Sequence, residues 1–257
     1  MVTSCASFAA RPLTPGISQP MRRNQVRGSA LMLKYHLPAI GVLGALCLFV
    51  VAAIYYPGGT MDSASAVGYS WAHNFVSSLF ASRALNGAAN PARYIAVPAM
   101  LLLCVSLGIM FRRISINVRS SRRAKKTIEI GGIGEMVYGF LAVTRMRDLM
   151  VSIGLLFSLA ALLAATHALY IERRWLLFAW GSICLALSLV SAAMYYGNVF
   201  YGFLPVVQKV SLVACIGWIV SLHYTRMDQE PAHERSALVV GSARKPSSTS
   251  PQCHQDR

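Results

Sequence analysis

The chain has 257 residues, of which 55% are hydrophobic and 13% are charged. A soluble domain carries about 25% charged residues, so this composition excludes an ordinary soluble domain and indicates a protein embedded in lipid. The formal net charge is +15, and positive residues collect in the cytoplasmic loops of membrane proteins. The charge therefore requires no nucleic acid, and we expect no nucleic-acid partner.

The chain opens with residues 1–34, which contain Pro12, Pro15, Gly16 and Pro20 among several arginines and show no apolar periodicity. This pattern predicts a disordered cytoplasmic tail. Residues 37–56 form the first apolar run long enough to cross a hydrocarbon core of about 30 Å. The tail is too long for an ordinary signal peptide, so we expect this run to remain as an anchor.

The connection 57–93 is the longest between predicted spans and is too apolar for disorder, which favours a functional loop. It contains the stretch SWAHNFVSSLF, and we predict a short helix over residues 69–85 that either lies at the outer membrane surface or re-enters between helices. On that helix His73, Asn74 and Ser77 would turn toward the bundle, and Trp71, Phe75 and Leu79 toward lipid or packed helices. A plain interfacial helix whose polar side meets water is the alternative. The predicted outer-loop polar site comprises His73, Asn74, Ser77, Ser78, Asn86 and Asn90, the last two of which also start turns.

Five further apolar runs follow, at about 94–111, 128–144, 149–171, 175–196 and 204–224. The run 128–144 is short, rich in glycine and interrupted by Glu135. With six spans and a cytoplasmic N-terminus, 19 of the 24 Lys and Arg residues lie inside, 4 lie outside, and Lys209 lies within a helix. Five spans would place Arg173, Arg174 and the basic C-terminal tail outside.

We therefore predict an all-α, polytopic integral membrane bundle of six transmembrane helices over 35–225, with both termini cytoplasmic. The tail 226–257 is rich in Ser, Pro and charge, which predicts a second disordered cytoplasmic tail. The expected location is the plasma membrane, and membrane lipids are the expected partners. The basic segment from Arg112 to Lys126 fixes the topology, and it can also attract anionic lipid headgroups.

The candidate intramembrane polar residues are Glu135, Gln208 and Lys209. A charged side chain in the bilayer is costly and marks either a structural pairing or a transport pathway. Lys209 can extend to the interface, and Glu135 can bond to a neighbouring helix. The cluster of Gly131, Gly132 and Gly134 predicts close helix packing rather than a nucleotide-binding loop.

The sequence favours a non-enzymatic protein. His73 and Ser77 are four residues apart, but nothing beside them supplies an orienting acid or an oxyanion hole, so we assign no catalytic residue. The cysteine spacings match no zinc site. His36, His167 and His223 fall near span ends, where interfacial histidines are ordinary, so we expect no metal and no cofactor.

The motif HNFVSSL followed by NGAANP, between a first and a second span and ahead of four more helices, resembles the DUF998 group of bacterial six-helix membrane proteins. That group is similar in appearance to the Frag1/DRAM/Sfk1 proteins. The resemblance covers residues 37–224. His73, Ser77 and Leu79 match the loop pattern of the group, whereas Ser78 and Phe80 stand where Asp and Gly are usual. Gln208 and Lys209 resemble a polar and basic pair of the last span.

The resemblance implies a six-helix protein of the bacterial inner membrane and no defined reaction. The leading hypothesis is a lipid-interacting or envelope-related protein. The alternatives are a small-solute or proton-coupled transporter, which would depend on Glu135 and Lys209, and an intramembrane hydrolase, which would depend on His73 and Ser77.

Overall fold

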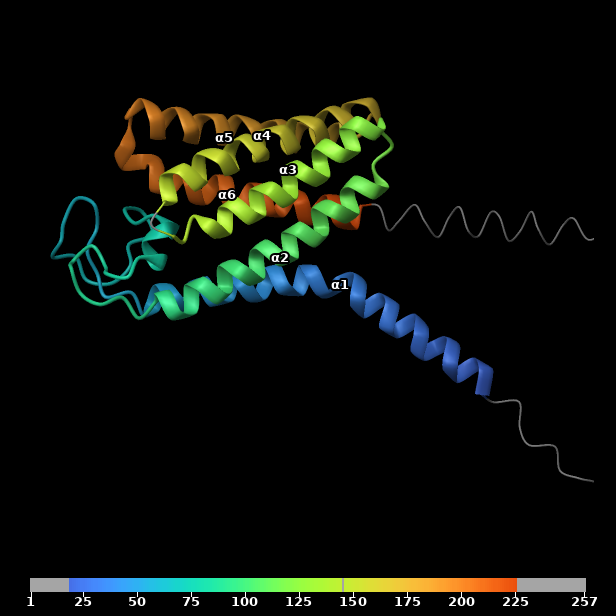
Figure 1. The fold of residues 1–257 in the computed structure, drawn as a ribbon, viewed down its shortest axis with the longest axis horizontal. Coiled ribbons are helices and arrows are strands. Elements are labelled where there is room, and N and C mark those ends of the chain that lie inside the picture. Colours follow the sequence, from blue (N-terminus) through green and yellow to red (C-terminus); the bar gives the residue numbers. More distant parts are fainter. Residues whose placement is uncertain (1–18, 145, 226–257) are drawn as a thin grey trace, which may run out of the picture. The chain divides into compact units, whose positions relative to one another are not determined.

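The computed structural model describes residues 19–144 and 146–225, with side chains from residue 35 onward (Figure 1). The predicted C-terminal tail 226–257 and residues 1–18 lie outside the described residues. Within the described ranges the chain is helical and contains no strand, which confirms the all-α class. Contacts divide the chain into one unit that ends at Leu37 and another that begins at Pro38.

Six α-helices make up most of the described chain. Five segments of it are long and apolar enough to cross a membrane, namely Tyr35–Ile54, Arg93–Asn117, Arg147–Ile171, Trp175–Gly197 and Tyr201–Tyr224. The helices are α1 (Gln19–Ile54), α2 (Arg93–Asn117), α3 (Arg122–Leu141), α4 (Arg147–Ile171), α5 (Trp175–Gly197) and α6 (Leu204–Tyr224), with short 3₁₀-helices η1 (Val76–Phe80) and η2 (Tyr201–Phe203).

Helix α1 begins at Gln19, inside the tail 1–34 for which no structure was expected. Pro20 lies in its first turn, where the missing N–H of proline costs nothing, and good helix formers follow it. The boundary between the two contact units falls just before Pro38, which lies inside α1. A proline within a helix removes one backbone hydrogen bond, so the helix is weakened at this boundary.

Five helices of the second unit form a closed ring, in which α2 packs on α3, α3 on α4, α4 on α5, α5 on α6, and α6 again on α2. The residues of α1 from Pro38 onward pack outside the ring against α2, where Gly41 faces Ser106 and Gly44 faces Leu102. In Figure 1 ring helices that follow one another along the chain run in alternating directions, and α6 and α2, which close the ring, run in the same direction. The half of the ring near the α2–α3 connection is filled by large buried side chains that include Met110, Ile128, Leu169 and Trp218.

Helix α3 packs between α2 and α4 at very short range. A Cβ atom added to Gly131 would lie 2.8 Å from the backbone oxygen of Phe157, and one added to Gly132 would lie 2.2 Å from the ring of Phe111. The predicted close packing through these glycines is confirmed. Helix α3 is not among the five long apolar segments, because Lys125, Lys126, Glu129 and Glu135 lie within its 20 residues.

Candidate functional site

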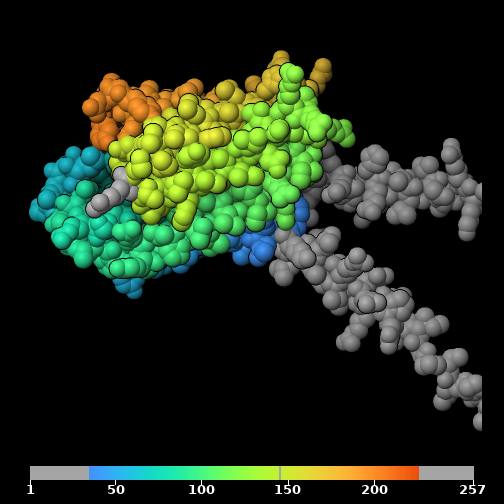
Figure 2. Space-filling model, in the orientation of Figure 1, coloured from blue at the N-terminus to red at the C-terminus, as the bar shows by residue number. Residues whose placement is uncertain are grey.

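Residues 57–92, called the loop cap from here on, lie over the end of the bundle where α2 begins and α3 ends (Figures 1 and 2). The helix predicted over 69–85 is wrong, because the only helical turn there is η1 (Val76–Phe80). Two isolated bridges, Gly58 with Val67 and Arg83 with Ala89, fold the rest back on itself. The tertiary contacts of this segment thus outweigh the spacing of its polar side chains, which had predicted a helix.

Asn74 is the centre of the loop cap, and its side chain is completely buried. The amide nitrogen donates to the backbone oxygen of Gly59 at 2.8 Å, and the amide oxygen accepts from the backbone nitrogen of Ser70 at 2.9 Å. Gly59 has a φ of +86°, a conformation that favours glycine. Asn74 therefore holds two separate stretches of the loop cap together.

Lys209 of α6 fastens the loop cap to the ring. Its ammonium donates to the backbone oxygen of Asn74 at 2.5 Å and to that of Pro205 at 3.0 Å. The hydroxyl of Tyr69 also donates to the Asn74 oxygen, at 3.3 Å, and the ammonium lies 5.7 Å from the centre of the Tyr69 ring. Burial, and to a lesser degree the neighbouring Tyr56, raises the pKa of Tyr69, so its hydroxyl stays a donor.

His73 and Ser77 do not form one face. The His73 ring is exposed and its Nδ1 lies 3.0 Å from a carboxylate oxygen of Asp62, whereas the Ser77 hydroxyl accepts from the guanidinium of Arg147 at 3.2 Å. The expectation that His73 turns toward the bundle is therefore wrong. The His73 side chain is exposed, and the buried side chain is that of the next residue, Asn74. Each residue has a different partner, so the arrangement that a Ser/His hydrolase requires is not formed by these bonds.

The remaining outer-loop residues shape the backbone. The side chain of Asn90 is buried, and its amide nitrogen donates to the backbone oxygens of Ser78, Leu79 and Ala81 at 3.3, 3.2 and 2.9 Å. Its amide oxygen accepts from the backbone nitrogen of Ala92 at 3.2 Å. The exposed Asn86 accepts from the nitrogen of Ala88 at 3.0 Å, as expected of a turn residue.

Aromatic contacts add to the attachment, and they include Phe75, which was expected to face lipid or packed helices. Phe80 packs on Phe49 of α1 with ring centres 6.0 Å apart, and Phe75 packs on Tyr201 at 5.9 Å. The hydroxyl of Tyr56 accepts from the nitrogen of Leu85 at 3.1 Å. Aromatic residues at both ends of the loop could have indicated such contacts, but the sequence does not tell which rings pair with which.

Glu135 lies inside the ring. One of its carboxylate oxygens would be 3.1 Å from a Cβ added to Gly154 of α4. The carboxyl is close enough to act electrostatically on the thiols of Cys104 in α2 and Cys215 in α6. Gln208 of α6 also buries its amide oxygen. Among the residues with described side chains, no ion pair links Glu135 to Lys209.

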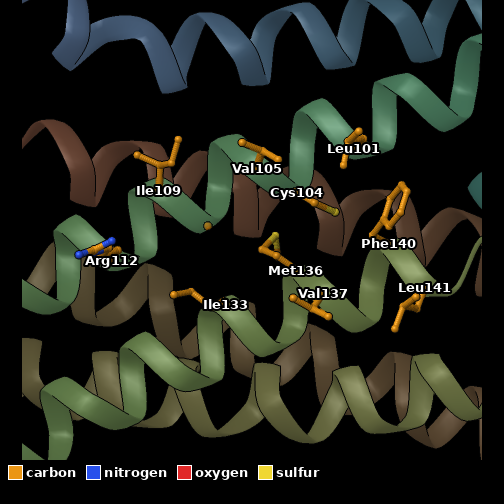
Figure 3. Close-up of a pocket in the computed structure, with 11 residues that line it drawn as sticks. Leu101, Cys104, Val105, Ile109, Arg112, Ile133, Met136, Val137, Phe140 and Leu141 are labelled. Atoms are coloured by element: carbon orange, nitrogen blue, oxygen red, sulfur yellow. The ribbon is translucent and has the colours of Figure 1, made fainter.

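A groove of about 420 Å³ runs between α2 and α3 on the surface of the ring (Figure 3). Arg112 lies at one end of it, and Phe140 and Leu141 lie at the other. The groove was not anticipated from the sequence. Its lining is Leu101, Cys104, Val105, Gly108, Ile109, Arg112, Ile133, Met136, Val137, Phe140 and Leu141.

Across the side chains described from residue 35 to 225, no group of three or more His, Cys, Asp or Glu residues is placed to hold a metal ion. No protein-family model, curated protein or solved structure matches the chain. The five long apolar helices indicate a multi-pass membrane protein, and the resemblance to the DUF998 group stays a prediction.

Proposed function

We propose that this chain is a non-enzymatic, lipid-binding integral membrane protein. The groove between α2 and α3 holds an acyl chain of a phospholipid whose anionic headgroup meets Arg112. The observation that carries the proposal is the shape and chemistry of this groove, which is apolar along its length and ends at a guanidinium (Figure 3). A guanidinium binds a phosphate oxygen pair through parallel hydrogen bonds.

The charge around Arg112 supports an anionic ligand. Arg112 is the first of seven Lys and Arg residues between positions 112 and 126. Its acidic neighbour, Glu129, is 4.0 Å away, and the Arg112 side chain stays 71% exposed. A contact this long between exposed groups is weak. The guanidinium therefore remains available to a headgroup.

The same proposal includes six spans, with both termini on the cytoplasmic side of the plasma membrane. Helix α3 has 20 residues, which is about 30 Å at the helical rise of 1.5 Å per residue. It packs between two long apolar helices, α2 and α4, and this placement supports its crossing. The six-helix architecture also agrees with the resemblance to the DUF998 group.

Topology is tested with reporters fused at Arg147 and at Arg174 in separate full-length proteins. Six spans place Arg147 outside and Arg174 in the cytoplasm, so the two reporters must differ in sidedness. Both reporters on one side of the membrane would refute the six-span proposal.

Lipid binding is tested on the full chain in vesicles that contain a phospholipid with a photoactivatable acyl chain, as either phosphatidylglycerol or phosphatidylcholine. We expect crosslinks in α2 and α3, with phosphatidylglycerol preferred. Gly108→Leu fills the groove, because a Cβ at this position meets only Met136, at 4.0 Å. That substitution is expected to remove the α2 and α3 crosslinks without unfolding the protein.

Headgroup recognition is tested with Arg112→Gln, and Arg123→Gln is the matched control. Both residues belong to the basic segment, but Arg123 does not line the groove. We expect Arg112→Gln to lower the preference for phosphatidylglycerol several-fold and Arg123→Gln to leave most of it. Equal losses in the two variants, or crosslinks that Gly108→Leu does not affect, would contradict the proposed site.

A further inference from the structure

Polar groups gather inside the ring in the half nearest the loop cap. Among residues with described side chains, four buried polar atoms lack a hydrogen-bond partner, and three of them belong to Glu135, Ser191 and Gln208. Glu135 is six residues from the loop-cap end of α3, Ser191 is six from that end of α5, and Gln208 is four from that end of α6. At 1.5 Å per residue they lie about 9, 9 and 6 Å from those ends.

Further polar side chains continue this set along α6. Cys215 follows Gln208 by seven residues, so the two share a face of α6. Cys215 is partly buried, and Cys184 of the neighbouring helix α5 is completely buried. Glu135, Ser191 and Gln208 thus lie within about 10 Å of the loop-cap ends of α3, α5 and α6, and Cys215 lies eleven residues, about 16 Å, from that end of α6.

Among the residues with described side chains, no ion pair involves the Glu135 carboxyl. The titratable groups that face it are the Cys104 thiol from α2 and the Cys215 thiol from α6, while α4 presents Gly154. On its own helix, Tyr138 lies one turn away and stacks on Phe157. An ionised carboxylate without a positive partner is costly in an apolar interior, whereas the protonated acid is tolerated.

The other half of the ring is filled mainly by apolar side chains, and the buried polar residues described there, Ser115, Thr166 and His223, lie at least 19 residues from the loop-cap ends of their helices. Met110 of α2, Ile128 of α3 and Trp218 of α6 are all completely buried there. On the loop-cap side, Gln208 is nearer to the end of the bundle than Glu135 is. The next residue, Lys209, donates to the backbone oxygen of Asn74 in the loop cap. Exchange with water is therefore expected from the loop-cap side only.

We propose that Glu135 is a proton-binding site inside the five-helix ring and that it exchanges its proton with the loop-cap side of the membrane. The carboxylate takes a proton from hydronium and releases water, and the reverse step returns the proton. No other bond changes. Cys104 borders both this site and the lipid groove, but proton binding at Glu135 does not require an occupied groove, so failure of either proposal leaves the other in place.

The test uses an apolar carbodiimide, which forms a stable adduct with a protonated carboxyl group in an apolar environment. The full chain in liposomes is labelled and its peptides are mapped by mass spectrometry. We expect an adduct on Glu135 that declines as the pH is raised on the loop-cap side, and no adduct there in Glu135→Gln. The matched control is Glu129→Gln on the same helix, which removes an exposed carboxyl and is expected to keep the Glu135 adduct.

Infrared spectroscopy of the same liposomes supplies a second readout that does not depend on reagent access. We expect a carbonyl band of a protonated carboxyl group in the wild type and in Glu129→Gln, and its loss in Glu135→Gln. Changing the pH on the loop-cap side alone should titrate this band, and changing it on the opposite side alone should not. A band that survives Glu135→Gln, or one that responds to the opposite side first, would overturn the proposal.

Discussion

The ammonium nitrogen of Lys209 lies 2.5 Å from the backbone carbonyl oxygen of Asn74. This contact joins the last helix of the bundle to the most deeply buried polar residue of the loop cap. Because the side chain of Asn74 bonds to Gly59 and Ser70, one lysine stabilises two turns of the loop cap together. The attachment of the loop cap therefore depends on a residue that the sequence presents as an isolated charge within an apolar span.

Replacement of Lys209 by Met is expected to loosen the loop cap. The change removes two charge-assisted hydrogen bonds, and one such bond contributes about 1.5–3 kcal/mol. We expect a lower melting temperature in detergent and faster thiol labelling of a cysteine placed at Leu79, which is 2% exposed in the wild type.

The control for this change is Lys125→Met. Lys125 also donates to a backbone oxygen, that of Ile116 at 3.1 Å, but at an exposed position away from the loop cap. This variant is expected to leave labelling at position 79 unchanged. If Lys209→Met also left it unchanged, the loop cap would be held by its other contacts, such as the Arg147 bond to Ser77 and the aromatic pairs.

Asn74→Ala is expected to destabilise the protein more than Asn86→Ala. The first change leaves the oxygen of the buried Gly59 and the nitrogen of the partly buried Ser70 without their Asn74 partner, and an unpaired buried group costs about 1–3 kcal/mol. The second removes one exposed turn bond, to Ala88. Thermal unfolding of both variants in the same detergent measures the difference, and similar melting temperatures would show that Asn74 is not structurally important.

Cysteine scanning is expected to separate residues that a helix would have placed on one face. In a background without native cysteines, cysteine at His73 or Arg83 should react rapidly with an impermeant thiol reagent, because both positions are exposed. Cysteine at Ser77, whose native hydroxyl is partly buried beside Arg147, should react more slowly. Equally rapid labelling at all three positions would indicate an undocked loop.

Gly131→Ala is expected to disturb the packing of α3 on α4. The added methyl group would lie 2.8 Å from the backbone oxygen of Phe157, which cannot rotate away, and overpacking of this kind costs about 1–3 kcal/mol. Gly108→Ala is the matched control, because its nearest neighbour is the Met136 side chain at 4.0 Å. Both changes raise helix propensity alike, so a melting temperature that is no lower in Gly131→Ala than in Gly108→Ala would show that contact with α4 does not restrict this position.

The helices could be predicted from the sequence because each depends on local composition. The predicted spans 175–196 and 204–224 agree closely with α5 (Trp175–Gly197) and α6 (Leu204–Tyr224). The loop cap could not be predicted in the same way, since its conformation depends on contacts such as that between Asn74 and Lys209, which are 135 residues apart.

Some residues of the candidate site could likewise be identified from the sequence, and others could not. Glu135, Gln208 and Lys209 were identifiable because polar side chains stand out in apolar runs. The roles of Asn74 and His73 were not, because residue type does not tell which of two adjacent polar side chains is buried. The groove at Arg112 was missed because its shape is made by the spacing of two helices, and no residue marks it.

The long separation between Asn74 and Lys209 also sets the order of events during biosynthesis. Residues 57–92 are synthesised and leave the ribosome before α6 is made. During this interval the loop cap lacks the Lys209 ammonium that holds it in the complete chain. The loop cap can acquire its final form only when the last helix has been inserted. Protection of Leu79 is thus a marker of completed assembly, and a chain truncated before α6 would expose the loop cap to proteases and to quality-control factors.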